Sequence, residues 1–71
     1  MQVLGVKYKT ANVDGVERIV YKRIGQPLYA VVVKFTPRAV HLRNIDYPHD
    51  IFYVPPLEFK KEWRACLKRG L

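Results

Sequence analysis

The stretch that decides the fold is residues 51–67, IFYVPPLEFKKEWRACL. Its first four residues are apolar and are typical of a short β-strand. Pro55 and Pro56 come next. Because proline has no N–H to donate to a ladder, the strand has to end before them, and Pro56 suits the first turn of a helix. A strand, a sharp stop and a new element therefore follow one another within a few residues.

The residues after the two prolines predict an amphipathic helix over 57–67, within a helical C-terminal segment 55–71. Acidic residues lie toward its start and basic residues toward its end, as the helix dipole favours, and the glycine at position 70 suits a C-cap. One face carries the apolar positions, spaced i, i+4, i+7 and i+8: Phe59, Trp63, Cys66 and Leu67. We interpret that face as the lid of a core.

The rest of the chain predicts a sheet. Alternation with a period of two indicates strands, and residues 12–15, Asn-Val-Asp-Gly, form a turn that joins the first two strands into a hairpin. The third strand is apolar on both faces, which is typical of a central or strongly curved strand. The expected strands cover residues 3–10, 16–24, 28–36, 39–45 and 51–54. We expect one α+β domain over 1–71: a small, strongly bent antiparallel sheet or partly open SH3-like barrel of about five strands (1–54) with one C-terminal helix.

Charge is the strongest functional signal. The 71 residues include 13 Lys and Arg against six Asp and Glu, a formal net charge of +7. Such a field attracts nucleic acid or an acidic protein surface, while an inert basic surface is the third alternative. No apolar run is long enough for a signal peptide or a membrane span, and the single cysteine, Cys66, has no internal disulfide partner. We therefore expect a cytoplasmic protein that does not bind membranes.

Two groups of basic residues are candidate contacts for such a partner. On the expected helix, Lys60, Arg64 and Lys68 repeat every four residues beside Lys61, and their spacing suits a phosphate backbone or an acidic strip. A solvated helix face is the plainer reading. The second group lies on the expected strands, where charged residues also protect sheet edges. Its members are Lys7, Lys9, Arg18, Lys22, Arg23, Lys34 and Arg43.

The sequence offers little chemistry for catalysis. His41, Asp46, His49 and Asp50 are the only cluster with metal-like side chains, and a surface turn explains them better than a metal site. Cys66 lies on the apolar stripe of the expected helix, where a thiol usually serves as a small buried apolar group. The chain has no glycine-rich phosphate loop, C-x-x-C pair or G-x-S-x-G motif. We expect a protein that is not an enzyme and that binds neither a metal nor a cofactor.

Four pieces of the sequence form a combined pattern. Residues 15–20 are a G-x-x-x-x-V hairpin, 40–43 a central strand that ends in a basic residue, and 47–49 a Tyr-Pro-His loop, and Pro56 precedes an F-x-x-x-F/W helix with Phe59 and Trp63. This combination resembles small, poorly characterised proteins of temperate bacteriophages and prophages. The resemblance implies a small accessory protein that acts on host or phage machinery.

Taken together, these observations predict a non-enzymatic nucleic-acid-binding accessory or regulatory protein that uses a basic surface. The first alternative is an inhibitor or adaptor that docks on an acidic host protein, with aromatic residues of the 46–53 region as anchors. The second alternative is an assembly protein that forms a homodimer or larger homo-oligomer through a free sheet edge.

Overall fold

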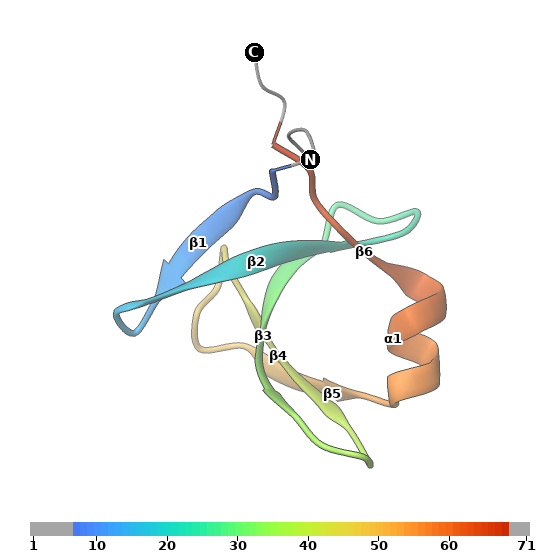
Figure 1. The fold of residues 1–71 in the computed structure, drawn as a ribbon. Coiled ribbons are helices and arrows are strands. Elements are labelled where there is room, and N and C mark those ends of the chain that lie inside the picture. The colour runs from blue at the N-terminus through green and yellow to red at the C-terminus, as the bar shows by residue number, and fades with distance from the viewer. Residues whose placement is uncertain (1–6, 69–71) are drawn as a thin grey trace, which may run out of the picture.

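The computed structural model describes residues 7–68, which form a six-stranded antiparallel sheet and one short helix (Figure 1). The strand order is β1-β2-β3-β4-β5, and β6 also pairs with β2. The sheet bends but does not close into a barrel. An antiparallel sheet with one short helix after β5 confirms the α+β class. The elements are β1 (Thr10–Val13), β2 (Val16–Arg23), β3 (Tyr29–Phe35), β4 (Val40–Asn44), β5 (Ile51–Val54), α1 (Pro56–Glu62) and β6 (Trp63–Ala65).

The first hairpin differs from its prediction in where the first strand ends. β1 continues through Val13, which pairs with Val16, so the turn contains only Asp14 and Gly15. Both have positive φ, 53° and 81°, which is the backbone of a type I′ turn, and the Gly15 N–H donates to Asn12 Oδ1. The prediction of a strand over residues 3–10 was therefore largely wrong: only Thr10 belongs to β1, Tyr8 forms an isolated bridge, and residues 3–6 lie outside the described part.

β3 contains an irregularity that alternation alone does not reveal. The register with β4 shifts between Val32 and Lys34, so one residue of β3 is extra. The shift places Phe35 opposite Val40, on the other side of the sheet from the one that strict alternation from Val31 predicts, and Phe35 is exposed. The Val32 carbonyl instead accepts a hydrogen bond from Arg18 Nη1 at 3.1 Å. The remaining strands lie where the alternation predicts them, within one residue at each end.

The C-terminal helix is much shorter than predicted. α1 ends at Glu62, and Trp63 takes an extended backbone (φ −122°, ψ 142°) that begins β6. β6 lies on the edge of β2 with Lys22 opposite Arg64, and the Ile24 N–H donates to the Glu62 carbonyl at 2.8 Å. The prediction of a helix over 57–67, within a helical segment 55–71, was therefore wrong for residues 63–68, and residues 69–71 lie outside the described part. An open edge of β2 pairs with β6 instead.

One side of the sheet and α1 enclose the main core. Trp63 is 4% exposed and lies between two other rings, with its ring centroid 5.8 Å from that of Phe52 and 6.4 Å from that of Phe59. The predicted lid is thus confirmed for Phe59 and Trp63. It is wrong for Leu67, which is exposed. The buried core residues are Ala30, Val40, Leu42, Val54 and Trp63, with Tyr21, Leu28, Val32, Phe52 and Phe59 packed against them.

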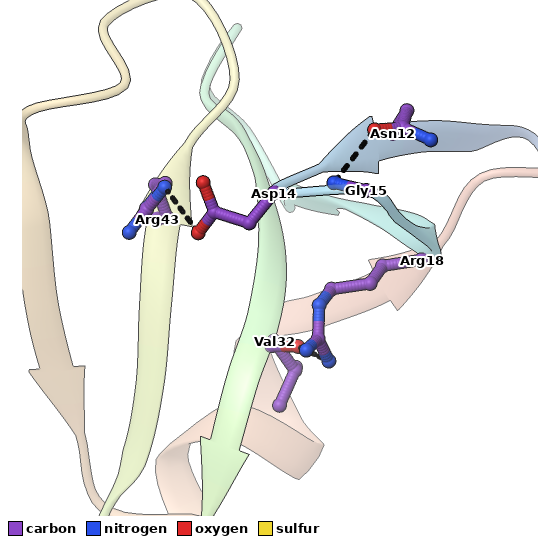
Figure 2. A network of polar contacts seen from close by, with 6 residues as sticks. All are labelled: Asn12, Asp14, Gly15, Arg18, Val32 and Arg43. Atoms are coloured by element: carbon purple, nitrogen blue, oxygen red, sulfur yellow. Dashed lines mark hydrogen bonds and ion pairs between the residues drawn. The ribbon is translucent and has the colours of Figure 1, made fainter.

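The opposite side of the sheet has a smaller buried centre, Val20 and Val31, which pair across β2 and β3. Asp14, at the tip of the β1–β2 hairpin, reaches over this side and forms an ion pair with Arg43 of β4 (Figure 2). Within residues 7–68, no helix has the length and apolar character that a membrane crossing requires.

Candidate functional site

Three segments meet at one point of the backbone and bring the two ends of the described chain together (Figure 1). The Lys9 N–H donates to the Cys66 carbonyl at 2.9 Å, the Cys66 N–H to the Val20 carbonyl at 2.8 Å, and the Val20 N–H to the Lys9 carbonyl at 2.9 Å. The three hydrogen bonds form a closed ring. β1 and β6 therefore share one edge of β2, each taking half of it.

Beyond this junction the two ends pair with each other. Tyr8 forms an isolated antiparallel bridge with Leu67, and the Lys68 N–H donates to the Lys7 carbonyl at 2.9 Å. In this pattern Lys7 lies opposite Lys68. This pairing was not predicted, because residues 7–9 were expected in a strand and residues 66–68 in the C-terminal helical segment. We call this two-stranded segment, residues 7–9 with 66–68, the terminal ribbon.

The register of the terminal ribbon determines which side chains share a side. Residues opposite each other, and residues two apart along a strand, point the same way. Lys7 and Lys68 are opposite each other, Lys9 is two residues after Lys7, and Arg64 is two residues before Cys66, which lies opposite Lys9. All these side chains therefore lie on the same side.

Pairing with β2 extends this group onto the sheet. Lys22 lies opposite Arg64 on one neighbouring strand and opposite Tyr29 on the other. The Lys9 ammonium lies 5.8 Å from the centroid of the Tyr29 ring, a cation–π distance that connects the ribbon to the sheet. We call this surface the basic face, and it consists of Lys7, Lys9, Lys22, Arg64 and Lys68 around Tyr29.

None of the five cations of the basic face forms an ion pair within residues 7–68; the two ion pairs of that part are Arg23 with Glu62 and Arg43 with Asp14. Two of the five are positioned by backbone carbonyls. Lys22 Nζ donates to the Arg23 carbonyl at 3.3 Å, and Arg64 Nη1 donates to the carbonyl of Lys60 in α1 at 2.7 Å. Their positive charges are thus held in place without neutralisation, which leaves them free for an anion.

The terminal ribbon also borders a shallow hollow. It has a volume of about 460 Å³, and Tyr8, Lys9, Thr10, Leu67 and Lys68 line it. Two ammonium groups beside apolar side chains suit a chain-like anion that lies along the surface. The hollow is open and is not a pocket that encloses a small ligand.

The predicted helical row of cations does not exist. Lys60 and Lys61 are exposed on α1, whereas Arg64 lies in β6 and Lys68 in the terminal ribbon, so these residues are not spaced along one helix. The row was wrong because the helix ends at Glu62. Arg64 and Lys68 nevertheless belong to the basic face, but strand pairing brings them there.

Arg18 and Arg43, two of the predicted contact residues, have structural partners instead (Figure 2). Arg18 Nη1 donates to the Val32 carbonyl at 3.1 Å, and Arg43 Nη1 lies 3.2 Å from Asp14 Oδ2. The Nε atom of each arginine is buried. The two guanidinium groups hold the β1–β2 hairpin against β3 and β4, and Arg43 also lines a hollow of about 200 Å³.

The sequence does not assign two aromatic features near these sites, although Tyr53 belongs to the 46–53 region that was expected to anchor a protein partner. Tyr29 lies at the centre of the basic face, and the rings of His41 and Tyr53 contact each other with centroids 4.5 Å apart. The sequence does contain part of the signal, since alternation puts His41 on the side of β4 opposite its buried residues. Which residues lie opposite each other across strands depends on register, and the sequence does not supply it.

The metal-like residues do not form a cluster. His41 belongs to β4, whereas Asp46, His49 and Asp50 lie in the exposed β4–β5 connection. Within residues 7–68, no three His, Cys, Asp or Glu side chains are arranged to hold a metal ion. Cys66 is half-buried at the three-segment junction.

Comparison with known proteins adds no family. No protein-family model, no curated protein and no solved structure matches this chain. The geometry of the basic face is therefore the basis for the functional conclusion.

Proposed function

We propose that this protein is a non-enzymatic accessory or regulatory protein that binds the phosphate backbone of nucleic acid through the basic face. One observation carries the proposal: the pairing of the two chain ends gathers five cations on one side of the sheet, none of them in an ion pair within residues 7–68. Like charges placed close together repel each other, so the arrangement costs stability unless an anion binds there.

Contacts to phosphate explain both the strength and the low sequence specificity that we expect. Lysine and arginine that neutralise phosphates release counterions, whatever the base sequence. If all five cations do so, the slope of log K against log salt is about −4.5 for duplex DNA and about −3.5 for a single strand. Raising the salt from about 50 to 200 mM then weakens duplex binding roughly 500-fold.

Two charge-reversal variants test this proposal. Lys9→Glu/Lys68→Glu changes two exposed residues of the basic face, and Arg38→Glu/Lys61→Glu makes the same change in net charge at exposed residues of the β3–β4 turn and α1. Fluorescence anisotropy with mixed-sequence DNA and RNA is the assay. We expect the first variant to lose most of its affinity and to show a shallower salt slope, whereas the control loses little. Equal losses in both variants, or no binding by the wild type at about 50 mM salt, would contradict the proposal.

We also propose that the sheet is an open relative of SH3-like barrels and that the protein works in the cytoplasm. The first is supported by the chain path, in which a short helix follows β5 and a final strand returns to β2. The second is supported by the free Cys66, which suits a reducing compartment.

A second candidate function is docking on an acidic partner protein. It is favoured by two tyrosines near the β4–β5 connection, Tyr47 and Tyr53, which are 70% and 66% exposed and resemble interface anchors. A complex with a single protein that survives nuclease treatment and depends on both tyrosines would support this function over nucleic-acid binding.

A further inference from the structure

A row of three side chains crosses β3, β4 and β5 at some distance from the basic face. His41 lies opposite Lys34 on one side and opposite Tyr53 on the other, so all three point to the same side of the sheet. The His41 and Tyr53 rings have their centroids 4.5 Å apart and are tilted by 56°. We call Lys34, His41 and Tyr53 the aromatic row.

The tyrosine of this row is open to a ligand. Tyr53 is 66% exposed although it stands in a strand, and Ile51, two residues earlier on the same side, is 46% exposed. His41 is half-buried and supports the tyrosine ring from one side. Lys34 is exposed and forms no ion pair within residues 7–68. The row thus offers an aromatic surface beside a free cation.

Register places the aromatic row and the basic face on the same side of the sheet. His41 and Arg43 are two residues apart, Arg43 lies opposite Val31, and Val31 is two residues after Tyr29, which lies opposite Lys22 of the basic face. From strand spacing and rise, the distance from Tyr29 to Tyr53 is roughly 15–20 Å. Between the two sites the side is occupied by the Asp14–Arg43 ion pair over the buried Val31.

We propose that the aromatic row is a base-stacking site that makes the protein prefer single-stranded nucleic acid. The inference rests on the proposed function of the basic face, which would hold the phosphates of the same strand. Bases stack on aromatic side chains only when they are unstacked from their neighbours, so a duplex cannot use the Tyr53 ring. The free charge on Lys34 favours a polyanion at this site and disfavours a cationic or purely apolar partner.

Substitution of Tyr53 separates stacking from charge. Tyr53→Leu removes the ring but no charge, Tyr53→Phe keeps the ring, and Tyr47→Leu is a matched control at a similarly exposed tyrosine. Each protein is titrated into a labelled oligonucleotide of about 16 bases, in single-stranded and duplex form. We expect the wild type to bind the single strand more tightly. Tyr53→Leu should lose about fivefold or more of its single-strand affinity and keep its duplex affinity, while Tyr53→Phe and Tyr47→Leu stay close to the wild type.

The same titrations distinguish failure of this inference from failure of the proposed function. Suppose that Tyr53→Leu binds the single strand like the wild type, while Lys9→Glu/Lys68→Glu loses affinity for both the single strand and the duplex. The aromatic row is then not a stacking site, and the basic face remains the binding surface. If the wild type binds neither substrate, both proposals fall. Unchanged oligonucleotide binding, together with loss of a nuclease-resistant protein complex in Tyr53→Leu, would assign the row to a protein partner and overturn the inference. Unchanged thermal unfolding of each variant confirms that the fold is intact.

Discussion

The terminal ribbon makes a prediction about stability that needs no ligand. Lys7 and Lys68 lie directly opposite each other, both are exposed, and like charges in that position repel. Lys68→Glu or Lys7→Glu should therefore stabilise the fold by turning repulsion into attraction. The double variant, with two glutamates opposite each other, should lose that gain.

The magnitude follows from the energies of exposed cross-strand pairs. With a pair energy of about 0.2–0.5 kcal/mol, each single variant gains roughly 0.5–1 kcal/mol, and the double variant gains nothing from the pair. The coupling free energy in the double-mutant cycle is then about 1–2 kcal/mol. For a domain of this size, each single variant should raise Tm by about 2–8 °C.

Thermal unfolding followed by circular dichroism at low salt measures these differences. Arg38→Glu is the control, because it makes the same charge change at an exposed residue of the β3–β4 turn and corrects for the lower net charge. In about 1 M salt the Debye length falls to roughly 3 Å, and the coupling should shrink. Additive effects of the two substitutions, or a Tm change equal to that of Arg38→Glu, would refute the pairing of Lys7 with Lys68 and, with it, the geometry of the basic face.

Three further substitutions test other parts of the structure. Trp63→Ala removes the largest core side chain, at a cost of about 3–5 kcal/mol out of the roughly 4–10 kcal/mol of total stability of a domain of this length. Thermal unfolding followed by circular dichroism should therefore show a Tm that is lower by about 10 °C or more. Gly15→Ala should cost about 1 kcal/mol in urea unfolding, because φ is +81° there although nothing lies within 4 Å of the added methyl group. Arg43→Met should lower nucleic-acid affinity less than Arg64→Met does, because the Arg43 guanidinium already has an aspartate partner; equal losses in anisotropy titrations would show that Arg43 also contacts phosphate.

Local patterns predicted the elements whose boundaries depend on neighbouring residues. The alternation of residues 40–44 predicted that Val40, Leu42 and Asn44 share a side, and all three are buried. The Asp-Gly pair placed the first turn, and the two prolines ended β5. These features are local because turn conformation and side-chain direction follow from adjacent residues.

All five cations of the basic face could be named from the sequence, but two of them for a reason that the structure corrects. Lys7, Lys9 and Lys22 were expected on strands, and they lie in the terminal ribbon and in β2. Arg64 and Lys68 were expected on a helix, but they lie in β6 and in the terminal ribbon. Arg18 and Arg43 look equivalent to these residues in the sequence. Only their contacts with the Val32 carbonyl and Asp14 separate them from the free cations.

By itself, the sequence determined a basic, sheet-rich α+β domain, the four strands β2 to β5, and the aromatic residues Phe59 and Trp63 as part of its core. The tertiary structure decided where the helix ends. A short amphipathic segment has little helical stability of its own. The open edge of β2 offers backbone hydrogen bonds as far as Cys66, while Trp63 still reaches the core. The same pairing brings the two chain ends together and creates the basic face, because contacts between residues about 60 positions apart depend on strand register and not on any local pattern.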